Sequence, residues 1–357
     1  MSTPLAALLK ARIAASGPMR LSDYMAECLL HPEYGYYTRA EPFGRGGDFI
    51  TAPEISQMFG ELLGLWLAQC WLDQGAPGRF TLAEAGPGRG TLMADILRAT
   101  RSVPGFHQAM AVHLVEASPR LRQVQREALQ GYDIVWADSL ADLPETPLWF
   151  VANEFFDALP VRQFIREPSG WSEAMVVLEG DRLAHGRSAP RGVPALAHRL
   201  GDTRAGDVVE LCPAARPLTE AVAGRIARHG GAALIVDYGD WRSRGDTLQA
   251  MKAHGYAGLF DSPGEADLTA HVDFEPLALE AEAAGLRAYG PIPQGDLLRA
   301  LGIEARAARL AERLSGDKLQ NHLAATRRLT DAAEMGTLFK ALALLPTTTP
   351  CPAGFTP

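Results

Sequence analysis

The stretch Phe80-Thr-Leu-Ala-Glu-Ala-Gly-Pro-Gly-Arg-Gly-Thr91 decides the fold of this chain. Its first six residues, 80–85, are typical of a short buried strand, and a helix is predicted from Thr91 to about residue 101. Between them, Gly86, Gly88 and Gly90 permit a sharp bend and remove the Cβ atoms that would keep a ligand away. The stretch therefore predicts a strand–loop–helix unit, which either binds a small molecule at the helix N-terminus or is a plain structural turn.

Strands and helices alternate along the chain around this unit. Further strands are predicted at residues 112–116, 133–137, 149–153 and 232–237, with helices at 118–130 and near 218–229. Such alternation predicts parallel βαβ units and an α/β fold with helices on both faces of the sheet. We expect this domain to span residues 79–357, preceded by a helical and loop subdomain, residues 1–78, that caps the site.

Three segments interrupt the alternation and are expected to be insertions. Residues 161–210 begin with three antiparallel strands, residues 240–272 form a long loop, and residues 295–330 form two polar-faced helices. A long loop in a compact domain is usually functional. The run at 338–345 then returns the chain to the sheet.

Composition excludes several classes of protein. The 357 residues carry a net charge of −8, which disfavours binding to a phosphate backbone. The four cysteines have no metal-ligand spacing and fit a reducing compartment. No apolar run reaches the length of a membrane span. We therefore expect no nucleic-acid partner, no metal and no membrane insertion.

An acid before the glycine loop indicates the kind of ligand. Gly-x-Gly-x-Gly departs from the dinucleotide fingerprint, and Glu84 would repel a pyrophosphate. A carboxylate there suits S-adenosylmethionine, which carries a sulfonium, an ammonium and a ribose. Glu116, at the end of the second strand, could accept the ribose hydroxyls, and Asp138, after the third, the adenine amino group. Each could instead be an ordinary surface residue.

The segment Asn153-Glu-Phe-Phe-Asp-Ala-Leu-Pro160 follows the fourth strand. Ligands of an open α/β sheet bind beyond the carboxyl ends of its strands. Asn153, Glu154 and Asp157 are therefore expected near the group that is transferred, where they could hold a cationic nucleophile.

Seven motifs in order resemble the MidA family of bacterial and mitochondrial methyltransferases, over nearly the whole chain. They are His31-Pro-Glu-Tyr-Gly-Tyr-Tyr37, Gly47-Asp-Phe-Ile-Thr-Ala-Pro-Glu-Ile-Ser56, Glu84-Ala-Gly-Pro-Gly-Arg-Gly90, Asn153-Glu-Phe-Phe-Asp-Ala-Leu-Pro160, Val236-Asp-Tyr-Gly239, Ala266-Asp-Leu-Thr-Ala-His-Val-Asp-Phe274 and Met335-Gly-Thr-Leu-Phe-Lys340. The resemblance implies a class I methyltransferase fold: a seven-stranded, mostly parallel sheet with a reversed last strand. It also implies S-adenosylmethionine as methyl donor and an arginine of a complex I subunit as acceptor, in the bacterial cytoplasm or the mitochondrial matrix.

An arginine acceptor assigns roles to particular side chains. Carboxylates could fix the guanidinium plane, and the candidates are Glu154 and Asp157, with Asp48 from the N-terminal loop. His271 could accept the departing proton. Alternatives stay open: Glu154 as a ligand of the donor or a structural cap, Asp157 as a helix N-cap, and His271 as a hydrogen-bonded loop residue.

Two other functions are compatible with the same fold. One is a nicotinamide-dependent oxidoreductase, which an NADH titration would reveal. The other is a non-catalytic assembly chaperone that retained the fold, which would leave the methylation of its partner unchanged when deleted.

Overall fold

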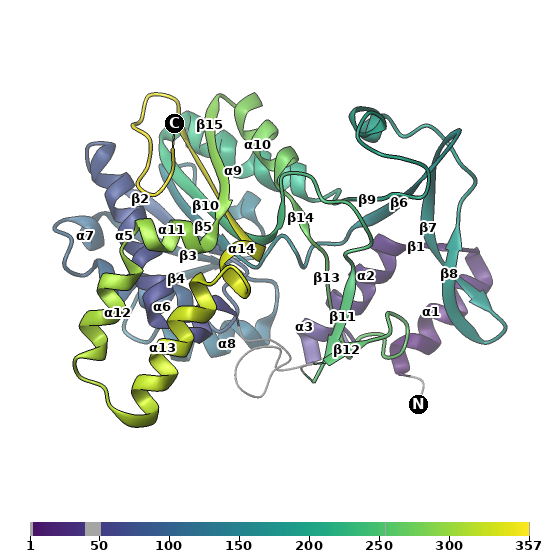
Figure 1. Ribbon diagram of the computed structural model, residues 1–357, viewed down its shortest axis with the longest axis horizontal. Helices are drawn as coiled ribbons and strands as arrows, with labels where there is room; N and C mark the ends of the chain where they lie inside the picture. Colours follow the sequence, from purple (N-terminus) through teal and green to yellow (C-terminus); the bar gives the residue numbers. More distant parts are fainter. Residues whose placement is uncertain (1–2, 40–50, 254, 357) are drawn as a thin grey trace. The chain divides into compact units, whose positions relative to one another are not determined.

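The computed structural model describes residues 3–39, 51–253 and 255–356 and divides the chain into two compact units (Figure 1). The first, the N-terminal unit, comprises Met1–Phe49, Asp157–Ala215 and Arg242–Asp273. The second, the sheet unit, comprises Ile50–Phe156, Arg216–Trp241 and Phe274–Pro357. Neither unit is continuous in sequence.

A mostly parallel sheet forms the centre of the sheet unit. Seven strands follow the order β15 (Leu286–Pro293), β16 (Phe339–Pro346), β10 (Gly231–Asp240), β5 (Leu148–Asn153), β2 (Phe80–Ala85), β3 (Met110–Val115) and β4 (Ile134–Ala137). Neighbours from β10 to β4 are parallel, whereas β16 is antiparallel to both β10 and β15. This confirms the predicted α/β class I fold with its reversed last strand.

Helices cover the sheet (Figure 1). The longer ones are α5 (Gln57–Asp73), α6 (Thr91–Thr100), α8 (Pro119–Ala128), α9 (Ala215–His229) and α10 (Phe274–Ala283). α5 packs closely on α6, because an added Cβ at Gly60 would lie 2.5 Å from the Cβ of Asp95. Apolar side chains from both helices and from β2, including Trp66, Leu97 and Leu82, are fully buried in one core. The glycine loop therefore connects two rigidly packed elements.

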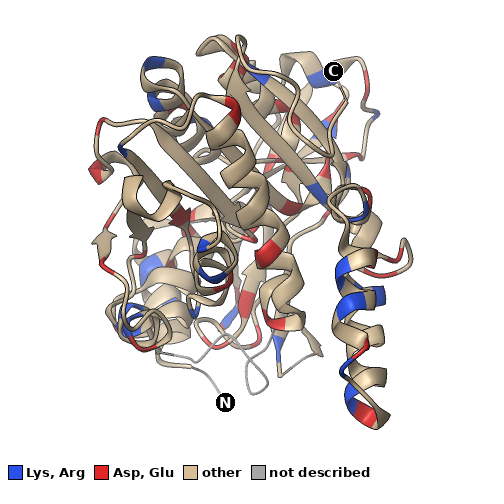
Figure 2. Cartoon of the chain, turned by 90° about the vertical axis from the view of Figure 1, so that its left-hand side faces the viewer, with Lys and Arg blue, Asp and Glu red and all other residues tan. Residues whose placement is uncertain are grey.

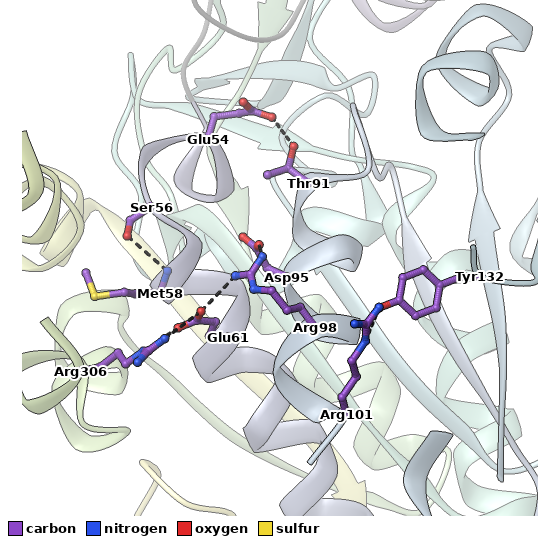
Figure 3. Close-up of polar contacts among 10 residues, drawn as sticks. All are labelled: Glu54, Ser56, Met58, Glu61, Thr91, Asp95, Arg98, Arg101, Tyr132 and Arg306. Atoms are coloured by element: carbon purple, nitrogen blue, oxygen red, sulfur yellow. Dashed lines mark hydrogen bonds and ion pairs between the residues drawn. The ribbon is translucent and has the colours of Figure 1, made fainter. Parts of the chain in front are cut away.

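Residues 294–330 form three helices instead of the two expected: α11 (Gln294–Ala300), α12 (Ile303–Ala311) and α13 (Gly316–Thr330). Gly302, in the left-handed conformation, caps the start of α12 and separates it from α11. α12 is tied to α5 by Arg306, which donates to both carboxylate oxygens of Glu61, while Arg98 of α6 donates to the same carboxylate (Figure 3). Short helices complete the unit: α4 (Ala52–Ile55), α7 (Phe106–Ala109), η1 (Leu140–Asp142) and α14 (Met335–Leu338).

The N-terminal unit combines helices with an antiparallel sheet. Its helices are α1 (Pro4–Ser16), α2 (Leu21–Leu30), α3 (Tyr36–Arg39) and the 3₁₀ helix η2 (Pro194–Leu200). The strand order is β1 (Met19–Arg20), β7 (Gly170–Glu179), β6 (Arg162–Glu167) and β9 (Val208–Leu211), with β8 (Arg182–Arg187) also on β7. The three antiparallel strands predicted after residue 160 are therefore present.

The prediction of a long loop at 240–272 is wrong in one respect, because this segment contains a small sheet. Its three strands are β12 (Gly255–Ala257), β11 (Gln249–Lys252) and β13 (Asp267–Thr269). A further short strand, β14 (Val272–Asp273), follows in sequence and is not part of this sheet. Strands of two to four residues are too short to show an alternating pattern in the sequence.

The division of the chain also differs from the expected boundary at residue 78. α5 belongs to the sheet unit because it packs on α6, and residues 157–215 and 242–273 group with the N-terminal segment. That this segment caps the site stays a prediction.

Basic and acidic residues are interspersed along the elements (Figure 2).

Candidate functional site

The loop after β2 has the left-handed backbone that glycine allows. Gly86, Gly88 and Gly90 have φ values of 62°, 52° and 83°. An added Cβ at Gly86 would lie 2.8 Å from Cδ2 of Phe155, so the position excludes larger residues by contact as well as by conformation. The loop thus leaves bare backbone at the carboxyl end of β2, where α6 begins.

Glu84 is a buried carboxyl with an unused acceptor. Its side chain is only 3% exposed and accepts a hydrogen bond from the Met93 N–H. No group among the described residues hydrogen-bonds to its Oε2. Burial raises the pKa of Glu84 to about 8. Such an atom costs stability unless a donor, above all a cationic one, is supplied from outside the chain.

Asn153 provides a second unused acceptor on the neighbouring strand. β5 and β2 are parallel, with Ala152 opposite Ala85, so Asn153 and Glu84 lie near the same edge of the sheet. The Asn153 amide nitrogen donates to Oε1 of Glu154 at 3.0 Å, but its Oδ1 is buried without a partner in the described part of the chain. Two adjacent strands therefore carry, near their carboxyl ends, buried acceptors without a donor among the described residues.

Glu116, directly after β3, is held in place by hydrogen bonds from its surroundings. Ser118 N–H donates to its Oε1 at 2.7 Å, and Nε2 of Gln125 donates to its Oε2 at 3.2 Å. Burial raises its pKa, although these hydrogen bonds act in the opposite direction. Gln125 also donates to the Gly88 carbonyl at 2.8 Å and so connects the glycine loop to this carboxylate. Sequence reasoning missed Gln125, because nothing in a polar helix marks one glutamine as buried.

Asp138 has a different environment from the other three polar residues. Its side chain is 85% exposed and pairs with the Arg122 guanidinium at 2.5 Å. Arg122 donates as well to the backbone carbonyls of Glu116 and Ala137. A contact of Asp138 with adenine stays a prediction.

Glu154 projects from the end of β5 on a strained backbone. Its φ of 51° is rare for a residue with a side chain. The carboxylate is partly buried and accepts hydrogen bonds from the Ala52 N–H at 3.1 Å and from Asn153. Burial raises the pKa of Glu154, while these hydrogen bonds lower it. The result is a fixed carboxylate with a strengthened affinity for a proton.

Asp157 and His271, two of the other predicted catalytic residues, belong to the N-terminal unit. Asp157 is buried in the N-terminal unit, and its charge contributes, after burial, to the raised pKa of Tyr37. It caps no helix, because a turn and then β6 follow it. His271 belongs to the same unit and is held through its backbone N–H, which donates to Thr247 Oγ1 at 2.8 Å. Asp48 lies outside the described residues.

Comparison with known proteins identifies the family. Residues 62–292 match the family model described as S-adenosyl-L-methionine-dependent methyltransferase. The chain belongs to this family. A crystal structure of a Burkholderia thailandensis protein bound to S-adenosyl-homocysteine is 31% identical, with a TM-score of 0.85, over 98% of this chain and 93% of that one. The predicted family, fold and cofactor are thereby confirmed.

Curated relatives of the methyltransferase are similar over most of their length. The protein arginine methyltransferase NDUFAF7, mitochondrial, of Danio rerio is 40% identical over 84% of this chain and 76% of its own length. Its counterpart in Homo sapiens is 37% identical over 96% of this chain and 84% of its own length.

Within the ranges that the structure covers, no helix is long and apolar enough to cross a membrane. Nor do three or more His, Cys, Asp or Glu side chains of those ranges gather as a metal ion would require.

Proposed function

We propose that this methyltransferase modifies an arginine of a protein substrate, and that a subunit of respiratory complex I is the substrate to test first. The observation that carries the proposal is the Glu154 carboxylate, fixed by the Ala52 N–H at the end of the strand beside the glycine loop. The relatives named as protein arginine methyltransferases support the choice of acceptor.

The unused acceptors fit the donor molecule, which supplies an electrophilic methyl group on a sulfonium when bound. Glu84 and Asn153 would accept hydrogen bonds from its ammonium group, since both have a buried oxygen without a partner in the described chain. Glu116 would accept the ribose hydroxyls, and Asp138 the adenine amino group. The bare backbone of Gly86, Gly88 and Gly90 would allow close approach.

Glu154 would act on the acceptor in two ways. A guanidinium is always charged and spreads its lone pairs over three nitrogens, so it is a weak nucleophile. A carboxylate that is already held by the protein can fix one edge of this plane and align one nitrogen for attack. Because burial strengthens its affinity for a proton, Glu154 can also hold the proton that leaves the nitrogen. Asp157, Asp48 and His271 stay candidates for further contacts with the acceptor.

A radiolabel assay with matched variants tests this function. Purified protein is incubated with methyl-labelled S-adenosylmethionine and complex I subunits, and mass spectrometry then locates the modified residue. Glu154→Gln should lower kcat by about 100-fold or more, because a neutral amide neither pairs with the guanidinium nor accepts its proton. Glu304→Gln, at a side chain that is 76% exposed, is the control and should leave kcat unchanged.

Three outcomes would count against the proposal. Methyl groups found only on residues other than arginine would exclude the acceptor. Donor binding without any transfer, and with unchanged subunit methylation on gene deletion, would favour the assembly chaperone. Saturable NADH binding without a response to the methyl donor would favour the oxidoreductase.

We infer the cellular location from the relatives alone. Both are named as mitochondrial, which supports a mitochondrial location if this chain is eukaryotic. The matrix, or the cytoplasm of a bacterium, is our expectation beyond those names. Fractionation with an antibody to the chain would test this.

A further inference from the structure

Strand β10 supplies acceptors to three consecutive N–H groups after β5. The Glu154 N–H donates to the Val236 carbonyl at 2.9 Å. The N–H groups of Phe155 and Phe156 both donate to Oδ2 of Asp237, at 3.2 and 2.9 Å. A side-chain carboxylate thus continues the sheet pairing around the bend and takes the place of a backbone carbonyl for these two donors.

Asp237 is itself firmly held. Its side chain is fully buried, and its Oδ1 accepts a hydrogen bond from the Tyr238 N–H at 2.9 Å. Its neighbours on β10 pair with β5 on one side and β16 on the other. The carboxylate therefore has a fixed position from which to anchor the turn.

The turn needs an anchor because Glu154 has a left-handed backbone. A residue with a Cβ persists in this conformation only when the surrounding structure imposes it. With the N–H groups at 155 and 156 bound to Asp237, the chain cannot rotate back to an extended conformation at 154. The same constraint directs the Glu154 carboxylate towards the Ala52 N–H.

We propose that Asp237 is a positioning residue of the methyl transfer, acting through Glu154. This inference rests on the proposed role of Glu154 in binding the acceptor. It also gives a function to the Val236-Asp-Tyr-Gly239 motif.

A double-mutant cycle separates positioning from general structural support. Asp237→Asn keeps the shape of the side chain but replaces one of its two acceptor oxygens with an NH2 group. This donor would face a backbone N–H group that now donates to the carboxylate. We expect kcat to fall at least 30-fold, while KM for the acceptor and Kd for S-adenosylhomocysteine change less than threefold. In the Glu154→Gln background, the same substitution should lower kcat less than twofold further, because the group that Asp237 positions is already lost.

Asp240→Asn is the matched control. The Asp240 carboxylate also accepts a hydrogen bond from the N–H of the next residue, Trp241. Unlike Asp237, however, Asp240 is exposed at the end of β10. Its replacement should leave kcat unchanged. Equal effects of the two substitutions would overturn the proposal, as would a loss of kcat by Asp237→Asn that is equally large with and without Glu154.

Crystal structures of Asp237→Asn and Asp237→Ala provide a readout that does not need activity. We expect Glu154 to leave the left-handed region and to lose the hydrogen bond from Ala52. An unchanged φ and hydrogen bond would overturn the positioning role. A wild-type protein that transfers no methyl group would refute the proposed function instead, and these structures would still decide whether Asp237 holds Glu154. If Asp237→Ala does not fold, Asp237→Asn alone decides.

Discussion

Replacing Glu84 with glutamine should stabilise the ligand-free protein while weakening cofactor binding. Burial raises the pKa of Glu84 from its ordinary value of 4.5 to about 8, and its Oε2 has no hydrogen-bond partner among the described residues. The Glu84 carboxyl therefore binds its proton more tightly in the folded chain than in the unfolded chain. Below about pH 4.5 the carboxyl is neutral in both states, so its ionisation costs no stability; this cost of ionisation then grows with pH and levels off above about pH 8.

The size of the effect follows from the shift in pKa. At pH 7.5, linkage gives an upper limit of about 4 kcal/mol for the destabilisation by Glu84, of which Glu84→Gln should recover a part. The variant should gain most near pH 8 and little at pH 5. Because a hydrogen bond to a charged group contributes about 1.5–3 kcal/mol, the same variant should bind S-adenosylhomocysteine about 10- to 100-fold more weakly.

Urea unfolding from pH 5 to pH 8.5 and calorimetric titration at pH 7.5 measure the two effects. Glu61→Gln is the matched control, because Glu61 is also a buried glutamate. Its burial is outweighed by hydrogen bonds from Arg306 and Arg98, which lower its pKa, so this substitution should destabilise the protein. The reasoning is refuted if Glu84→Gln is less stable than the wild type at pH 7.5 and binds S-adenosylhomocysteine with normal affinity.

Three further predictions address the glycine loop, the nucleoside contacts and the ion pair between Arg306 of α12 and Glu61 of α5. Gly86→Val should lower the calorimetric affinity for S-adenosylhomocysteine by about 100-fold or more, since its Cβ has neither space nor a favourable φ; normal affinity would exclude the loop as the binding site. Glu116→Ala should cost about tenfold or more in the same titration and Asp138→Ala about threefold, because Asp138 is mostly exposed; equal losses would contradict this ranking. Arg306→Met should lower the free energy of unfolding by about 1 kcal/mol in urea, as Arg306 is partly exposed and Glu61 keeps its second partner (Figure 3); an unchanged midpoint would show that the ion pair is unimportant.

The central sheet could be predicted because its pattern is local. Residues 80–85 form a strand as expected, since an apolar run that ends in glycines has few alternatives. Conversely, β11 to β13 could not be predicted from the sequence, because strands of three or four residues depend on pairing with their neighbours for stability. The grouping of residues 157–215 with the N-terminal segment could not be predicted either, because it arises from contacts between segments far apart in the sequence.

The site shows the same limit at the level of side chains. Glycine spacing and an adjacent acid pointed to Gly86, Gly88 and Glu84, because these residue types act through their own local chemistry. Gln125 and Asp237 have no such signature. Each matters through a hydrogen bond to a segment more than 30 residues away, which only the fold brings into reach.

A crystal structure of the protein with S-adenosylhomocysteine tests the central claim most directly. The account predicts that the ammonium group of the ligand lies within hydrogen-bond distance, about 3 Å, of Glu84 Oε2 and Asn153 Oδ1, with the ribose hydroxyls on Glu116. A ligand bound elsewhere, or one whose ammonium group contacts neither Glu84 nor Asn153, would contradict it.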